Sequence, residues 1–228
     1  MKINKINSLV ELFFEKYKEK KFSTKRPFLR WLKDDKNNFL TWEQVKFNIT
    51  ILSEYLSKIL SKGDRCILLS ENRPEWLITD IAIMNAGGVT VPLFTTYSEK
   101  DYEYIINDCK PKICIVSNNN QLEKIKKFIS NKTEVLSIEN FNKKIKNIRD
   151  ILKKNFDQSS KKTSLEYNNK IERKDLACII YTSGTTGNPK GVMLSHGGIL
   201  SNCEGAMEIL DSLIKKDSPT FLTWLPLS

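Results

Sequence analysis

The residues of this chain that are best suited to chemistry are gathered at positions 182–191. They read TSGTTGNPKG, which places four hydroxyl side chains, three glycines and one lysine directly after the apolar residues 176–181. Glycines let backbone N–H groups turn toward an anion, hydroxyls donate to phosphate oxygens, and a lysine adds a compact positive charge. We therefore predict that this segment binds a polyphosphate. A flexible linker, the simplest alternative, would need neither Pro189-Lys190-Gly191 nor the apolar strand before it.

The spacing of the segment differs from that of a Walker A loop, which has the form G-x-x-x-x-G-K-[ST]. Pro189 stands five residues after Gly184, where the Walker motif has its second glycine. Lys190 is followed by Gly191 rather than by Ser or Thr. The polyphosphate site is therefore not predicted to be that of a P-loop NTPase.

The longer stretch at residues 181–196, YTSGTTGNPKGVMLSH, resembles the phosphate-loop signature of the AMP-forming adenylating enzymes. That superfamily includes acyl-CoA synthetases, luciferases and the adenylation domains of peptide synthetases. Other stretches are similar to long-chain fatty acyl-CoA synthetases: GDR at 63–65, SENRPEW at 70–76, GG at 87–88, VP at 91–92 and LPLS at 225–228. The similarity extends over nearly the whole chain and is weakest between residues 117 and 172.

The resemblance implies a two-step reaction in which a fatty acid is first joined to AMP and is then transferred to coenzyme A. It implies ATP, Mg²⁺ and coenzyme A as cofactor, metal and co-substrate. No catalytic residue is assigned, and Thr182 is expected to lie near the magnesium ion. By the same resemblance, the residues that hold the β- and γ-phosphates are Thr182, Ser183, Gly184, Thr185, Thr186, Gly187 and Lys190.

The family pattern continues after Leu-Pro-Leu-Ser with a histidine, the adenine and ribose motifs, an acidic magnesium ligand, and a mobile C-terminal domain with a catalytic lysine. Residues 1–228 are therefore expected to be the truncated N-terminal part of the AMP-binding domain, without the lid domain and inactive alone. Two alternatives stay open. One is a shortened non-catalytic nucleotide-binding or remnant module, and the other is an adenylating enzyme for a different carboxylate.

The alternation of elements along the chain predicts an α/β fold, with a parallel sheet covered by helices on both faces. Residues 156–170 are polar and are expected to form a flexible loop. The lone His196 is expected to cap or pack a helix rather than act as a base, and Arg73 and Trp76 belong to a structural helix start. Helices are expected near residues 9–17, 41–60, 72–86, 98–108, 121–129 and 197–214, and strands near 28–32, 65–70, 89–93, 112–116, 135–138, 176–181 and 221–225.

Composition argues against a nucleic-acid partner in spite of a formal net charge of +10. Only six of the 37 basic residues are arginine, the residue preferred for bidentate recognition of phosphate and guanine. The excess is also concentrated between residues 110 and 175, where 17 basic residues face 8 acidic ones among many asparagines. Small-molecule substrates, namely fatty acid, ATP and coenzyme A, are the expected partners.

The chain has five cysteines without CxxC spacing, which indicates reduced thiols rather than disulfides or a zinc site. Residues 1–20 do not have the form of a signal peptide. Residues 76–94 are the most apolar stretch, but Asp80, Asn85 and Pro92 within it argue against a transmembrane segment. A cytoplasmic location is expected, and peripheral contact with a membrane stays open.

Overall fold

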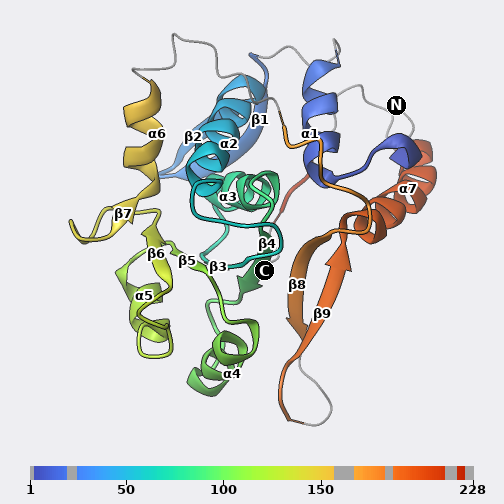
Figure 1. The fold of residues 1–228 in the computed structure, drawn as a ribbon. Helices are drawn as coiled ribbons and strands as arrows, with labels where there is room; N and C mark the ends of the chain where they lie inside the picture. Colours follow the sequence, from blue (N-terminus) through green and yellow to red (C-terminus); the bar gives the residue numbers. More distant parts are fainter. Residues whose placement is uncertain (1–2, 20–24, 157–166, 183–186, 214–219, 224–228) are drawn as a thin grey trace.

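The structure is a computed structural model that describes residues 3–19, 25–156, 167–182, 187–213 and 220–223. Strands and helices alternate from the third strand to the sixth, as is typical of an α/β fold (Figure 1). The helices are η1 (Ile3–Lys5), α1 (Leu9–Lys18), α2 (Trp42–Leu56), α3 (Pro74–Asn85), α4 (Glu99–Cys109), α5 (Asn119–Ile125), α6 (Ile148–Phe156) and α7 (His196–Leu213). The strands are β1 (Pro27–Lys33), β2 (Lys36–Thr41), β3 (Arg65–Leu69), β4 (Val89–Leu93), β5 (Ile113–Val116), β6 (Glu134–Ser137), β7 (Lys146–Asn147), β8 (Leu176–Thr182) and β9 (Lys190–Ser195).

The main sheet has the strand order β7-β6-β5-β3-β4-β8-β9. Its central strand β3 pairs in parallel with β4 and with β5. Parallel pairing continues through β6 to β7 on one side and reaches β8 on the other, where Thr90 is the partner of Cys178. Only the pairing of β8 with β9 is antiparallel among these strands. The predicted α/β class with a largely parallel sheet is therefore confirmed.

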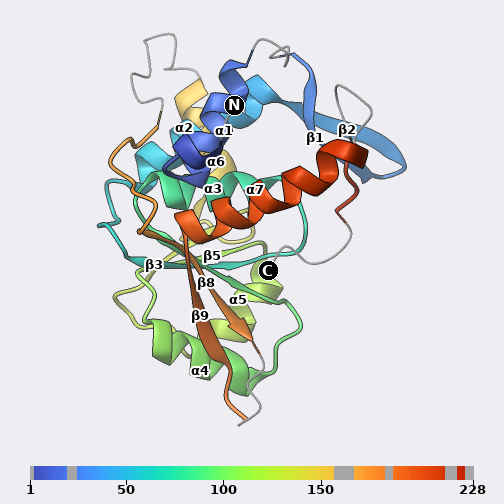
Figure 2. The same cartoon turned by 90° about the vertical axis from the view of Figure 1, so that its right-hand side faces the viewer.

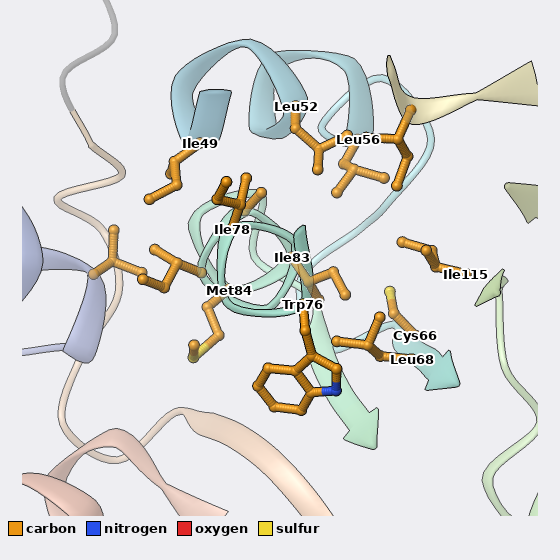
Figure 3. Close-up of a cluster of buried hydrophobic side chains, with 14 of the residues drawn as sticks. Ile49, Leu52, Leu56, Cys66, Leu68, Trp76, Ile78, Ile83, Met84 and Ile115 are labelled. Carbon is orange, nitrogen blue, oxygen red and sulfur yellow. The ribbon is translucent and has the colours of Figure 1, made fainter. Parts of the chain in front are cut away.

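Successive residues of β3 point into two different cores. Cys66 and Leu68 belong to the cluster under α1, α2, α3 and α6, part of which is drawn in Figure 3. Ile67 and Leu69 belong to the cluster under α4 and α5. Figure 2 shows the same division, with α1, α2 and α3 on one side of the sheet and α4 and α5 on the other. Because both faces are covered there, β3, β4 and β5 consist almost entirely of buried residues, which is why they could be recognised as apolar runs in the sequence.

Two of the expected helices begin at capping boxes, as the residues at their starts indicate. At the start of α2, Thr41 Oγ1 accepts from Gln44 N at 3.2 Å, and Gln44 Oε1 accepts from Thr41 N at 2.9 Å. Ser98 and Asp101 make the equivalent pair of bonds at the start of α4. Each pair satisfies backbone donors that have no partner within the helix, and so sets the point where the helix begins.

The β1–β2 hairpin is larger than the single strand expected at residues 28–32. Its turn is formed by Asp34 and Asp35, which have φ angles of 50° and 55°. Positive φ at both central residues is the geometry of a type I′ hairpin turn, and aspartate tolerates it better than most residues. The hairpin packs on α2 through Phe28 and Trp42, whose ring centroids are 4.0 Å apart. Its second strand begins with Lys36 and two asparagines, a composition that does not indicate a strand.

Two further differences concern the C-terminal third of the chain. The strand β9 was not expected, because its residues followed the predicted phosphate loop without an alternating pattern. The strand expected at residues 221–225 is absent from 221–223, and the rest of that range lies outside the described residues. The loop predicted at 156–170 is described only at its two ends. There, Tyr167 packs on Phe14 with a centroid distance of 5.7 Å.

Candidate functional site

The predicted phosphate-binding segment connects β8 to β9. Thr182 is the last residue of β8 and Lys190 is the first residue of β9. The two are paired directly across the antiparallel ladder. Directly opposed residues in such a ladder have Cα atoms about 4.5–5.5 Å apart. The strand register therefore sets a residue with a hydroxyl group opposite a residue with an ammonium group, although the two are eight positions apart in the sequence.

Three of the seven predicted phosphate-binding residues lie in the described part of the chain. Thr182, Gly187 and Lys190 are all exposed there. Gly187 has a φ of +100°, a conformation that glycine adopts without strain and other residues rarely do. The remaining four, Ser183, Gly184, Thr185 and Thr186, lie outside the described residues, so their assignment stays a prediction.

The Lys190 ammonium group pairs with no carboxylate among the described residues and is therefore available to an anion. It has no ion-pair or side-chain hydrogen-bond partner there, whereas the exposed Lys174 pairs with Glu172. An uncompensated ammonium group beside a hydroxyl can accept one phosphate group between them. The described geometry is therefore compatible with the predicted role of this end of the hairpin.

Tyr181 anchors the hairpin to the rest of the domain, which the sequence did not predict. Its side chain is 3% exposed, and its Oη donates to Asp108 Oδ2 on α4 at 2.5 Å. Its carbonyl oxygen accepts from Tyr97 Oη at 2.9 Å. Burial, and next the hydrogen bond to Asp108, raise the pKa of Tyr181 above its ordinary value, so the phenol stays neutral and donates. Figure 1 shows α4 beside the loop end of this hairpin.

Gly191 leaves the space beside β8 that the Tyr181 ring occupies. The two residues are partners in the ladder. A Cβ atom on Gly191 would lie 3.0 Å from Ile179 Cγ2 and 3.1 Å from Tyr181 Cζ. Contacts that short require the neighbours to shift. Gly191 therefore permits close packing in β9, a role distinct from that of a loop glycine that turns its N–H toward phosphate.

The lone histidine does not belong to this site. His196 follows the far end of β9, about 20 Å from Lys190 along an extended strand. It is 1% exposed, and its Nδ1 accepts from the backbone N of Leu9 at 3.3 Å. Burial lowers the pKa of His196 to about 4, against the opposing effect of Asp175, so the ring is neutral at pH 7. The packing role that the sequence analysis predicted is confirmed.

The helix start at α3 is also structural, as expected. Arg73 forms ion pairs with Glu75 at 3.2 Å and with Glu139 at 2.9 Å, which tie α3 to the segment after β6. Pro74 occupies the first turn, where its missing N–H leaves no hydrogen bond unmade. Trp76 is 6% exposed and belongs to the core drawn in Figure 3.

A complete metal site is not present in the described part of the chain, where no three His, Cys, Asp or Glu side chains come together. Magnesium prefers octahedral oxygen coordination and is commonly held by one or two carboxylates together with water and substrate phosphates. The Thr182 hydroxyl could supply one oxygen. These residues fit a magnesium ion that arrives with a nucleotide better than one held by the protein alone.

The sequence profile of the family described as AMP-binding enzyme matches residues 16–228. The chain therefore belongs to the AMP-binding enzyme family. Among curated proteins, fatty acyl-CoA synthetase A of Dictyostelium discoideum is 31% identical over 178 residues, which are 74% of this chain and 26% of that protein. The long-chain-fatty-acid–CoA ligase ACSBG2 of Homo sapiens is 35% identical over 173 residues, 71% of this chain and 25% of that ligase. The chain thus spans about a quarter of the length of these two relatives.

Solved structures share the fold at lower sequence identity. The anthranilate CoA ligase AuaEII in complex with anthranoyl-AMP superposes with a TM-score of 0.68 at 23% identity, over 86% of this chain and 36% of that one. The fatty acyl-adenylate ligase from L. pneumophila, in complex with acyl adenylate and pyrophosphate, gives 0.66 at 21% identity, over 90% and 33% of the two chains. The fold is therefore that of adenylate-forming enzymes. No helix in the part of the chain that the structure describes combines the length and apolarity needed to cross a bilayer.

Proposed function

We propose that this chain supplies the phosphate-binding hairpin of an ATP-dependent fatty acid–CoA ligase. The observation that carries the proposal is the β8–β9 register, which sets Thr182 opposite Lys190 at the two ends of the TSGTTGNPK segment. The names of the two relatives, a fatty acyl-CoA synthetase and a long-chain-fatty-acid–CoA ligase, support a fatty acid as the carboxylate. Their names support coenzyme A as the acceptor.

The proposed reaction has two displacement steps. In the first, a carboxylate oxygen of the fatty acid attacks the α-phosphorus of ATP, the bond from that phosphorus to the bridging oxygen breaks, and pyrophosphate leaves with the negative charge. In the second, the thiolate of coenzyme A attacks the acyl carbon and AMP leaves. The proton of the thiol passes to solvent or to AMP. Such displacements depend chiefly on positioning and on the neutralisation of charge.

The hairpin acts in the first step by holding the leaving pyrophosphate. Lys190 places a cation beside oxygens whose negative charge increases as the bond to the α-phosphorus breaks. Hydroxyl and glycine N–H groups of the segment donate to the same oxygens. Tyr181 keeps both strands of the hairpin in place. A magnesium ion bound with ATP would add positive charge there, with the Thr182 hydroxyl as one ligand.

The test is ATP–pyrophosphate exchange with a series of fatty acids, measured on the protein that carries these residues. Lys190→Ala should lower the exchange rate by about tenfold to 150-fold, since a hydrogen bond to a charged group contributes about 1.5–3 kcal/mol. Thr186→Ala should have a smaller effect, because a neutral donor contributes only about 0.5–1.5 kcal/mol. Lys174→Ala, which removes an exposed lysine away from the hairpin loop, is the matched control and should leave the rate unchanged.

The two half-reactions separate the role of Lys190 from a general loss of activity. When acyl adenylate is supplied ready-made, Lys190→Ala should transfer the acyl group to coenzyme A at the normal rate, because pyrophosphate has already left. Equal impairment of both steps would contradict the proposed role. Exchange that depends on another carboxylate, with no response to fatty acids, would indicate a different adenylating enzyme. Binding of ATP without exchange for any carboxylate would indicate a non-catalytic nucleotide-binding module.

A further inference from the structure

A cavity of about 380 Å³ lies at the opposite end of β9 from the phosphate-binding hairpin loop. It is bounded by the C-terminal end of α3, by residues 168–175 and by His196 at the start of α7. Its volume is near the lower end of the range for ligand pockets, about 300–1,000 Å³. It therefore has room for a small molecule only, and it is separate from the site described above.

His196 presents an unused hydrogen-bond donor to this cavity. Its side chain is 1% exposed and lines the cavity. Because Nδ1 accepts from the backbone N of Leu9 and the ring is neutral at pH 7, the ring proton is on Nε2. Among the described residues, none accepts a hydrogen bond from Nε2. An acceptor in the cavity would therefore satisfy a donor that has no hydrogen-bond partner among the described residues.

Two acceptors at the cavity, in contrast, already have donors. Asp175 Oδ2 accepts from Lys62 Nζ at 2.8 Å and from Glu172 N at 2.9 Å. The carbonyl oxygen of Gly87, at the end of α3, accepts from Gly63 N at 2.8 Å. The ion pair with Lys62 thus offsets part of the charge of Asp175, and the His196 ring N–H is a hydrogen-bond donor that remains for a ligand.

Lys170 adds a positive charge to the same cavity. It lines the cavity, and within the described ranges its ammonium group has no ion-pair partner. Two apolar side chains, Met84 and Ile171, also line it. A ligand that satisfies all these groups carries one negative charge at one end and a short apolar body at the other.

We propose that the cavity binds a small monocarboxylate with a short aliphatic chain. The carboxylate accepts from His196 Nε2–H and pairs with Lys170, and the aliphatic chain lies against Met84 and Ile171. Because the cavity is at the other end of β9 from Lys190, its occupant is not the acyl group that reacts with ATP. The proposal does not depend on the proposed ligase activity.

Residues 1–228 contain a single histidine, and the His196 imidazole NMR signals are identified as those lost in His196→Gln. The protein is titrated at pH 7 with sodium acetate, propionate and butyrate, with sodium chloride at equal ionic strength as the reference. We expect saturable shifts of the His196 signals with the carboxylates. Affinity should rise about threefold to fourfold for each added methylene group.

Variants locate the bound carboxylate. Lys170→Ala should raise the dissociation constant about twofold to fivefold, the range expected for loss of an exposed ion pair. Lys174→Ala is the matched control, because Lys174 is an exposed lysine four positions away that does not line the cavity. Ala86→Leu should abolish binding by filling the cavity, with urea unfolding to check that the protein stays folded.

Three results would overturn the proposal. The first is a non-saturating response of the His196 signals to all three acids. The second is a chloride response equal to that of butyrate. The third is the same dissociation constant for Lys170→Ala as for the unaltered protein. Each of them would mean that the cavity has no site for a carboxylate.

Discussion

The bond between Tyr181 and Asp108 is the contact by which α4 holds the end of β8, and its removal tests whether the hairpin depends on that anchor. Tyr181→Phe deletes the hydroxyl that donates to Asp108 Oδ2 at 2.5 Å and keeps the buried ring. Asp108→Ala deletes the acceptor. Tyr104, which lies on α4 with Asp108, is 36% exposed, and Tyr104→Phe is the matched control.

The magnitude follows from the surroundings of the bond. A hydrogen bond to a charged group contributes about 1.5–3 kcal/mol, but Asp108 is exposed, which lowers the net value. We expect Tyr181→Phe to reduce the free energy of unfolding by about 1–2 kcal/mol. Tyr104→Phe should change it by less than about 0.5 kcal/mol. The destabilisation expected for Tyr181→Phe raises the unfolded fraction roughly fivefold to thirtyfold.

The assay is urea unfolding of the unaltered protein, the two single variants and the double variant. If the two groups interact directly, the double variant should lose less stability than the sum of the single variants, with a coupling energy of about 1 kcal/mol. Pyrophosphate binding, measured by calorimetry, should weaken in Tyr181→Phe and not in Tyr104→Phe. A coupling energy near zero, or equal effects of the two Tyr→Phe changes, would refute the anchoring role.

Two further predictions concern packing and pH. Gly191→Ala should reduce the free energy of unfolding by about 1–3 kcal/mol, because its Cβ would lie 3.0 Å from Ile179 Cγ2; thermal unfolding measures this, and no loss would show that the strands can adjust. Burial lowers the pKa of His196 from 6.5 to about 4, so the unfolded chain binds more protons between these values. The resulting stabilisation, about 3 kcal/mol, is complete above pH 6.5 and is lost as the pH falls toward 4. Burial raises the pKa of Asp80 to about 6, and this shift stabilises the folded protein at low pH, opposite to the effect of His196. The contribution of His196 is therefore measured as the difference in the free energy of unfolding between the unaltered protein and His196→Gln, determined with urea between pH 4 and 6.5. If this difference does not change with pH, the prediction is contradicted.

Sequence alone determined those features that depend on neighbouring residues. The capping boxes at Thr41 and Ser98 set the starts of α2 and α4, because each satisfies backbone donors within four residues. The buried strands were recognisable because parallel strands covered on both faces are continuously apolar. The phosphate-binding role predicted for residues 182–191 rests in the same way on residue types and spacing.

Tertiary structure decided the features that depend on residues far apart in the chain. The pairing of β9 with β8, which sets Lys190 opposite Thr182, has no local signal, because it depends on how the strand returns after the loop. The bond from Tyr181 to Asp108 joins positions 73 residues apart, and no pattern in either segment predicts the other. The role of His196 likewise depended on Leu9, 187 residues away, which fixes which ring nitrogen carries the proton. Local hydrogen-bonding and apolar patterns fix elements, whereas the contacts between them are set by packing across the whole domain.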